Sequence, residues 1–212
     1  MERVIVYGAE FSVYVQAVLL TLIQKDIAYE LVNVNPFQIG GPEKDHLARN
    51  PFGYIPAFDD GKVRLYEAEA IARYIDEAYL GPELMPLQPE GRAYANQILS
   101  ILNSYAYPNW VRTLYIETIT KPKRGETPNH AAIEKALPIA RITLSEISRL
   151  KQIGGGGFLT GATVTLPDLF CAPMYATLCD TLEGAELVKK QPALQEWWRH
   201  MEQLEKIQEI II

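Results

Sequence analysis

The segment that decides the fold runs from Asn50 to Ile75 and reads NPFGYIPAFDDGKVRLYEAEAIARYI. It predicts a loop, a strand that opens on a proline, a tight turn, a second strand and a helix with an acidic first turn. Proline removes a hydrogen-bond donor from a sheet, so Pro56 at the head of the apolar run Pro56-Ala57-Phe58 needs a special backbone. A cis Ile55–Pro56 bond would supply it and would present the backbone of Ile55 as an edge for an extended peptide ligand.

The residues before this segment predict a β-α-β unit. The β-branched run Val4–Tyr7 is typical of a buried strand, the apolar run 13–23 of a buried helix, and residues 29–34 of a second strand. A connection of this kind joins parallel strands. Two prolines and the pair Gly40-Gly41 within residues 35–50 indicate a loop with at most a short helix.

Within the segment, the pair Asp60-Gly61 predicts a hairpin, so its two strands are expected to be antiparallel. From Glu67 onward, apolar residues recur with the spacing of a helix that has one buried face. They are Ala70, Ile71, Tyr74, Ile75 and Ala78. The order β-α-β followed by β-β-α is thioredoxin-like, and we assign it to residues 1–80, an α/β domain.

The composition changes after this domain. Three prolines within residues 81–91 indicate a linker. Beyond it we find no convincing strand, only helical patterns over 90–119, 129–152, 165–180 and 191–207. Pro108 is expected to kink the first of these helices. We therefore expect residues 92–212 to form an all-α domain.

The bulk composition narrows the class of protein. A hydrophobic content of 48% and a charged content of 22% are ordinary for a soluble globular chain. A formal charge of -6 disfavours nucleic acid and anionic membranes as partners, and no apolar stretch approaches the length of a membrane span. Cys171 and Cys179 are expected to lie about 12 Å apart on one helix, too far for a disulfide. We expect a cytoplasmic protein.

Four segments carry a resemblance to a known family over essentially the whole chain. They are VIVYGAEFSVYVQAVLLTL from Val4, the segment from Asn50, FLTGATVTLPDLFCAP from Phe158 and QPALQEWW from Gln191. Their order and spacing resemble those of the glutathione S-transferases, and of the phi class most closely. The resemblance implies an enzyme that activates the glutathione thiolate for attack on a small hydrophobic electrophile or a peroxide. It also implies a homodimer, with Phe52 as a candidate interface anchor.

Ser12 is the candidate catalytic residue. A free thiol has a pKa near ~8.5, and a helix N-terminus and a hydroxyl donor both favour the thiolate. Ser12 stands where the first predicted helix begins, and the resemblance implies that it donates its hydroxyl to the glutathione sulfur. The alternative is a plain helix cap. Tyr7 is the rival donor, Tyr14 a weaker third, and an acidic Glu10 nearby would oppose ionisation.

The resemblance also implies the glutathione-binding residues. Ile55 before Pro56 would pair with the cysteinyl backbone, and Glu67 would bind the γ-glutamyl amine. The helix N-terminal amides after Glu67 would hold the γ-glutamyl carboxylate. The family usually has serine where this chain has Ala68, so we expect binding to be weaker by about 1 kcal/mol. The neighbouring Glu69 adds a further negative charge.

The glycyl carboxylate of glutathione needs a cation. Phi-like sequences place a histidine and a lysine where this chain has Gly41 and Pro42. Lys44 or His46 would substitute if the loop folds differently, although each is also an ordinary loop residue.

The electrophile needs an apolar pocket over the sulfur. Aromatic residues flank Pro108, and Phe11 is expected to face them; the candidates are Phe11, Tyr107, Trp110 and Tyr115, with Tyr105 nearby. Aromatic residues at helical spacing are more often core, and at least half of these are expected to be simply buried. In contrast, Thr165 and Asp168 have the spacing of a capping box, which is a folding role.

Two other readings remain open. A binding or scaffold protein with this fold but without efficient chemistry is favoured by Ala68, by Glu10 and by the missing basic pair. A redox protein using its own cysteine is disfavoured, because both cysteines lie far along the chain from the first strand. The three histidines show no metal-ligand spacing, and we expect no metal.

Overall fold

The computed structural model describes residues 3–211, which divide into two compact units. The first unit holds the residues up to Glu83 together with Lys206 and those after it, and the second unit is Leu84–Glu205. The last helix, α10 (Glu205–Ile211), thus groups largely with the first unit, whereas the sequence placed it in the helical domain. Lys206 Nζ lies 2.7 Å from a carboxylate oxygen of Asp26, and Ile207 is fully buried. Burial of Tyr29 raises the pKa of its hydroxyl, and the negative charge of Glu209 in α10 raises it further.

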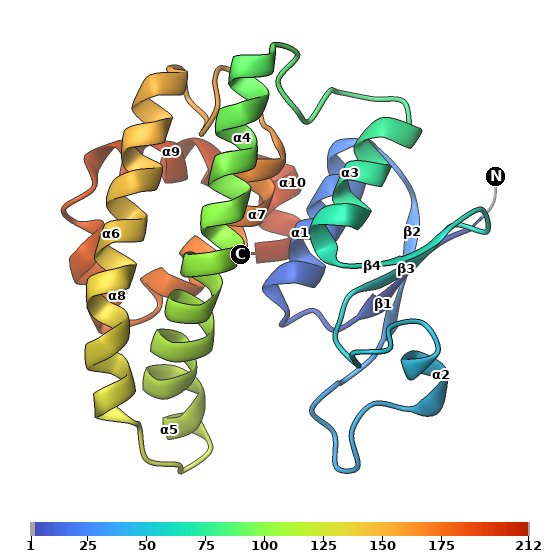
Figure 1. Ribbon diagram of the computed structural model, residues 1–212, viewed down its shortest axis with the longest axis horizontal. Helices are drawn as coiled ribbons and strands as arrows, with labels where there is room; N and C mark the ends of the chain where they lie inside the picture. Colours follow the sequence, from blue (N-terminus) through green and yellow to red (C-terminus); the bar gives the residue numbers. More distant parts are fainter. Residues whose placement is uncertain (1–2, 212) are drawn as a thin grey trace. The chain divides into compact units, whose positions relative to one another are not determined.

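The first unit is built on a four-stranded sheet in the order β2-β1-β3-β4. The strands are β1 (Val4–Gly8), β2 (Tyr29–Asn33), β3 (Ala57–Asp59) and β4 (Arg64–Tyr66). The β1–β2 pair is parallel, and the β1–β3 and β3–β4 pairs are antiparallel. Helix α1 (Val13–Gln24) joins β1 to β2, the short α2 (Lys44–Leu47) precedes β3, and α3 (Ala68–Ala78) follows β4 (Figure 1). The predicted thioredoxin-like order is confirmed.

The two faces of β1 have different surroundings. Val4, Val6 and Gly8 are buried, and a Cβ at Gly8 would collide with the side chain of Val15 in α1. Because successive strand residues point to opposite faces, Tyr7 lies on the face away from α1.

A buried ion pair joins the C-terminal ends of α1 and α3. Lys25 Nζ lies 3.0 Å from Asp76 Oδ1, and both side chains are almost completely buried. The same ammonium donates to the carbonyls of Asp76 at 2.7 Å and Tyr79 at 3.1 Å. Removing one partner of such a pair typically costs about 3–5 kcal/mol. No local sequence pattern predicts this contact.

The β3–β4 hairpin is organised by Asp60. Its carboxylate accepts hydrogen bonds from the N–H groups of Lys62 and Val63, each at 2.9 Å. The hydroxyls of Tyr74 and Tyr79 donate to its other oxygen at 2.7 and 2.8 Å. Burial alone would raise the pKa of Asp60, but these four donors hold it at about 2.

The second unit is helical. Its helices are α4 (Pro89–Ile101), the π-helical segment η1 (Leu102–Thr120), α5 (Lys121–Lys123), α6 (His130–Gly154), α7 (Leu166–Cys179), α8 (Leu182–Val188) and α9 (Pro192–Glu202). Figure 1 shows α4, η1 and α5 following one another in one long rod beside α6. Pro108 lies inside η1, where the Thr113 hydroxyl donates to the Pro108 carbonyl five residues earlier. Helix α8 was not predicted, and the helix predicted over 191–207 is divided into α9 and α10.

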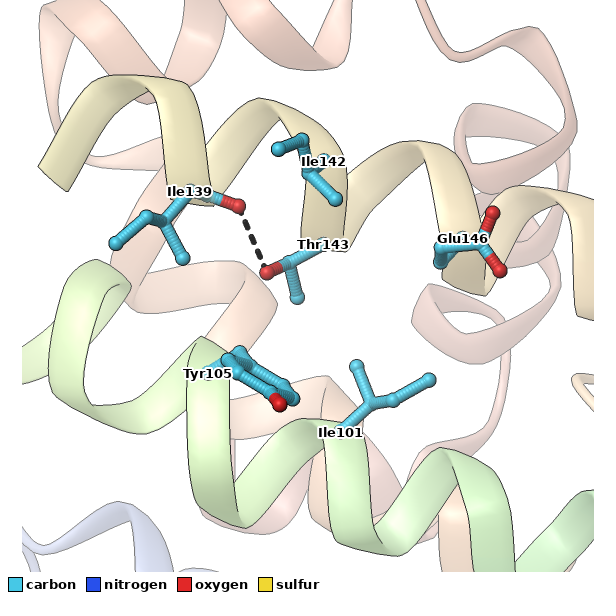
Figure 2. Close-up of a pocket in the computed structure, with 6 residues that line it drawn as sticks. All are labelled: Ile101, Tyr105, Ile139, Ile142, Thr143 and Glu146. Carbon is cyan, nitrogen blue, oxygen red and sulfur yellow. Dashed lines mark hydrogen bonds between the residues drawn. The ribbon is translucent and has the colours of Figure 1, made fainter.

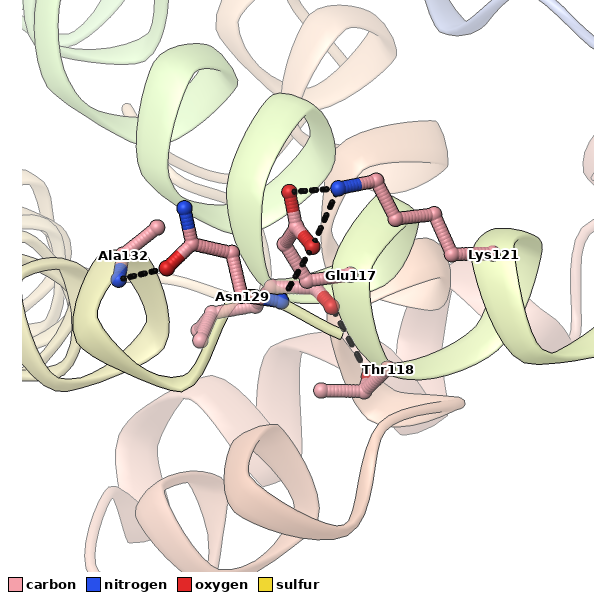
Figure 3. A network of polar contacts seen from close by, with 6 residues as sticks. Glu117, Thr118, Lys121, Asn129 and Ala132 are labelled. Carbon is pink, nitrogen blue, oxygen red and sulfur yellow. Dashed lines mark hydrogen bonds and ion pairs between the residues drawn. The ribbon is translucent and has the colours of Figure 1, made fainter. Parts of the chain in front are cut away.

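The turn into α6 is fixed by Glu117 (Figure 3). Its carboxylate accepts hydrogen bonds from Lys121 Nζ, at 2.8 and 2.7 Å, and from the N–H of Asn129 at 2.8 Å. These bonds, that of Lys121 first, lower the pKa of Glu117. Asn129 in turn accepts a bond from the N–H of Ala132 and so caps α6.

The predicted capping box at the start of α7 is confirmed. The Asp168 carboxylate accepts from the N–H of Thr165 at 2.9 Å, and also from the N–H of Leu159 and the indole N–H of Trp197, each at 2.8 Å. Burial raises the pKa of Asp168, although its donors oppose the rise. Among residues 3–211, no helix has the length and apolar character needed to cross a membrane.

The low pKa of Asp60 predicts an acid-dependent contribution to stability. The folded-state pKa is about 2, whereas an unfolded aspartate has a pKa near ~3.9. The carboxylate therefore stabilises the fold by about 2 kcal/mol above about pH 5, and this is lost as the pH falls towards about 2. Replacing Tyr74 and Tyr79 together by Phe should lower the free energy of unfolding at pH 7. The difference from the wild type should shrink at pH 3.

Urea unfolding at both pH values measures this effect. Asp59→Asn is the matched control, because Asp59 pairs with an exposed Arg64 at 2.7 Å and should contribute less than about 1 kcal/mol. If the double Phe variant loses the same free energy of unfolding at both pH values, the role assigned to the Asp60 carboxylate is refuted.

Candidate functional site

Ser12 is the N-cap of α1. Its Oγ accepts a hydrogen bond from the N–H of Val15 at 3.4 Å, and its own N–H donates to the carbonyl of Ala9 at 3.0 Å. The capping role is therefore present. Among the described residues the Ser12 hydroxyl proton has no acceptor, since the bond from Val15 uses only a lone pair. Ser12 can thus cap its helix and still donate to a ligand.

Tyr7, the rival hydroxyl, has a different environment. Its ring lies on the sheet face away from α1, and the guanidinium carbon of Arg49 stands 4.2 Å from the ring centroid. This is a cation–π contact. Arg49 was not singled out from the sequence, where the only signal is a single basic residue before the NPFG run.

The proline-led strand has the predicted special backbone, because the Ile55–Pro56 bond is cis. The carbonyl of Tyr54 accepts two hydrogen bonds, from His46 Nε2 and from Asn50 Nδ2, each at 2.8 Å. In the part of the chain that the structure describes, the N–H and carbonyl of Ile55 have no hydrogen-bond partner. The structure thus leaves a one-residue free edge just before β3.

His46 is already engaged in this arrangement. A carbonyl only accepts hydrogen bonds, so Nε2 carries a proton and donates it to Tyr54. The side chain is buried, and Nδ1 has no partner among the described residues. The Nε2–H of His46 is therefore already used within this loop. Lys44, the other candidate, is exposed on α2.

The start of α3 combines strain with free donors. Glu67 occupies the N-cap position with φ of 70°, a conformation that costs a non-glycine residue about 1–3 kcal/mol. Its carbonyl accepts the N–H of Ile71, and the first N–H groups of the helix have no intrahelical partner. Ala68 is buried at this point and offers no hydroxyl. Glu69 forms an ion pair with Arg73 at 2.7 Å, which offsets its negative charge.

The predicted pocket aromatics have unequal exposure. In the first unit, Phe11 is 60% exposed and its ring lies 6.2 Å from that of Phe37, itself 61% exposed. Phe37 was missed by the sequence reasoning, although an aromatic residue in a Gly- and Pro-rich loop is a usable signal. In the second unit, Trp110 has no exposed surface, while Tyr107 and Tyr115 are half-buried.

Tyr105 instead lines a surface cavity of about 400 Å³ between α6 and the end of α4 with the start of η1 (Figure 2). The other lining residues are Ile101, Ile139, Ile142, Thr143 and Glu146. Figure 2 shows Tyr105 and Ile101 from one side of this cavity and the remaining four from the other.

Neither cysteine is poised as a nucleophile. Both are free thiols, and burial raises the pKa of Cys171 and brings that of Cys179 to about 12. A thiol with so high a pKa is almost entirely protonated near neutral pH. Within residues 3–211 there is also no group of three or more His, Cys, Asp or Glu side chains able to hold a metal ion.

Comparison with known proteins gives consistent matches. Residues 6–83 match the family model for the glutathione S-transferase N-terminal domain, and residues 110–211 match that for the C-terminal domain. Glutathione S-transferase F11 of Arabidopsis thaliana is 30% identical, with 92% of this chain and 91% of the relative covered. A glutathione S-transferase of Hyoscyamus muticus is 31% identical, with 90% and 89% covered.

Solved structures agree with these matches. The structure of glutathione S-transferase III in its apo form has a TM-score of 0.85 at 28% identity, covering 99% of this chain and 95% of that one. A structure of glutathione S-transferase I bound with lactoylglutathione has a TM-score of 0.83 at 23% identity, covering 99% and 98%, and shares the fold. The related sequences are phi-class enzymes of plants, the class that the sequence predicted. The chain therefore belongs to the glutathione S-transferase family.

Proposed function

We propose that this protein is a glutathione transferase in which Ser12 stabilises the glutathione thiolate. The supporting observation is the placement of Ser12 relative to the free edge at Ile55. Tyr7 pairs with Ala57 in antiparallel register, so continuing that register sets Ile55 opposite Ala9, the residue whose carbonyl accepts the N–H of Ser12. A peptide cysteine that pairs with Ile55 would then carry its sulfur towards the start of α1.

The chemistry follows from this placement. The N-terminus of α1 carries partial positive charge, and the Ser12 hydroxyl supplies a hydrogen bond, so both lower the pKa of a thiol bound there. The thiol proton leaves to solvent. The thiolate forms a sulfur–carbon bond with the electrophile, and the leaving group departs with its bonding electron pair. Holding both reactants together supplies the remaining rate enhancement.

Two features weaken the objections raised by the sequence. Glu10 is exposed, so water and salt screen its charge from a thiolate. Glu69 is paired with Arg73. The missing hydroxyl at Ala68 still supports the second candidate, a binding or scaffold protein with this fold, and binding measurements together with rates separate the two.

We further propose a cytoplasmic location, which two free cysteines favour.

We also propose a homodimer. Phe52 is 65% exposed beside Tyr66, at a ring distance of 6.0 Å, and Ile142 at the cavity of Figure 2 is 63% exposed. An exposed aromatic ring and an exposed apolar cavity on one chain are complementary surfaces for a second copy. In this arrangement Phe52 of each copy enters the cavity of the other.

Replacing Ser12 by Ala tests the catalytic assignment. We expect glutathione to bind with similar affinity and its bound thiol to have a raised pKa. Conjugation to 1-chloro-2,4-dinitrobenzene at pH 6.5 should then fall by about 10²-fold, the loss typical of one hydrogen bond to a developing or stabilised anion. The difference in conjugation rate between Ser12→Ala and the wild type should become smaller near pH 9, where the thiolate forms without the serine. Calorimetry and the pH profile of kcat measure these effects.

Tyr7→Phe is the matched control and should change the rate less than about threefold, because its ring lies on the other sheet face. Loss of the rate in Tyr7→Phe with an unaffected Ser12→Ala would reverse the assignment. Binding without conjugation by the wild type would support the scaffold alternative, and no binding at millimolar glutathione would exclude the enzyme.

The dimer is tested by introducing charge at the cavity. Ile142→Asp and Phe52→Ser should each shift the protein towards a monomer in sedimentation velocity, because a buried unpaired charge or a lost aromatic anchor costs several kcal/mol. Leu182→Asp is the control, since Leu182 is exposed and does not line the cavity. A wild-type monomer, or a dimer that all three variants retain, would contradict the proposal.

A further inference from the structure

Glutathione ends in a glycyl carboxylate; the basic pair of the family is missing from this chain, and of the two possible substitutes His46 is engaged while Lys44 is exposed. The stretch 36–43 contains no basic residue. His46 is buried with its N–H donated to Tyr54, and Lys44 is exposed on α2. We propose that Arg49 supplies the cation that binds this glycyl carboxylate, an inference that rests on the proposed function.

Arg49 differs from the other arginines of the first unit. Arg3, Arg64 and Arg73 each form an ion pair with a carboxylate, to Glu30, Asp59 and Glu69 respectively. Arg49 takes part in no ion pair or side-chain hydrogen bond among residues 3–211, although it is half-buried. Its five N–H donors are therefore not used by a protein carboxylate in this part of the chain.

Its contact with Tyr7 prepares the guanidinium for an anion. The guanidinium carbon stands 4.2 Å from the Tyr7 ring centroid. Stacking over an aromatic face fixes the guanidinium but uses none of its five N–H donors. Those donors remain available for bidentate binding of a carboxylate, the geometry in which arginine binds this group most strongly.

The position of Arg49 suits the glycine end of the peptide. Tyr7 beneath it pairs with Ala57, two residues from Ile55. The Tyr7 backbone is therefore separated from the Ile55 edge by one strand spacing of about 4.8 Å and two residues of about 3.4 Å each, and Arg49 stacks on the ring of that Tyr7. Glycine is one residue beyond the cysteine that pairs with this edge.

The same framework holds both groups. The N–H of Arg49 donates to the carbonyl of His46 at 2.9 Å. The next residue, Asn50, donates to the carbonyl of Tyr54, whose peptide bond leads to Ile55. A ligand held at Ile55 and at Arg49 would therefore contact two parts of one hydrogen-bonded loop.

The test compares glutathione with its glycinamide analogue, in which a neutral carboxamide replaces the glycyl carboxylate. Calorimetric titration of the wild type should show about tenfold tighter binding of glutathione, the value expected for a charge-assisted hydrogen bond. In Arg49→Gln, glutathione should lose that tenfold while the analogue binds as before. Arg49→Lys should retain part of the preference, because it keeps the charge but not the bidentate geometry.

One further variant and a stability measurement sharpen the test. Lys62→Gln removes an equal charge from the exposed hairpin and should leave the preference for glutathione unchanged. Thermal unfolding of each variant checks that the fold is retained.

Several outcomes would overturn the assignment. If Arg49→Gln weakens both ligands equally, Arg49 acts only through packing on Tyr7. If Lys44→Gln removes the preference and Arg49→Gln does not, the cation is Lys44. If the wild type binds glutathione but has no preference for the carboxylate, no cation serves it. Failure of the wild type to bind either ligand would overturn the proposed function itself, and this assignment with it.

Discussion

The two hydrogen bonds donated to the carbonyl of Tyr54 are the constraint on which the site depends. His46 and Asn50 come from α2 and from the residues just after it, and they fix the loop immediately before β3. The Tyr54 carbonyl is bound by residues of its own loop, which fixes the shape of that loop. Among the described residues, the N–H and the carbonyl of Ile55 remain without partners at the sheet edge. The pairing of Tyr7 with Ala57 then sets this edge opposite the start of α1. The short helix α2 thereby helps to hold the loop that carries this unpaired edge.

The residues around Ala68 and Glu69 reduce the expected effect of these two departures from the family pattern. Ala68 removes a hydroxyl but leaves the unpaired N–H groups at the start of α3, where the strained Glu67 holds the chain in place. Glu69 is neutralised by Arg73 within the same helix. We therefore expect the loss of affinity caused by Ala68 to be that of one hydrogen bond.

Local patterns in the sequence predicted most of the fold, and contacts between distant segments account for what they missed. The hairpin at Asp60-Gly61, the cis Ile55–Pro56 bond and the capping box at Thr165 each follow from a few neighbouring residues. The Lys25–Asp76 pair and the stacking of Arg49 on Tyr7 join residues far apart in sequence. For the same reason, Ser12 and Ile55 could be singled out from sequence, whereas Arg49 could not.

The membership of α10 in the first unit has a consequence for biosynthesis. Lys206 contacts Asp26, so the first unit is discontinuous in sequence and the whole of Leu84–Glu205 is inserted within it. Domains generally fold in the order in which the ribosome releases them. Here the sheet and its helices are synthesised first, but the first unit is complete only when α10 has also been synthesised. The second unit is continuous in sequence and can therefore fold before the first unit is complete.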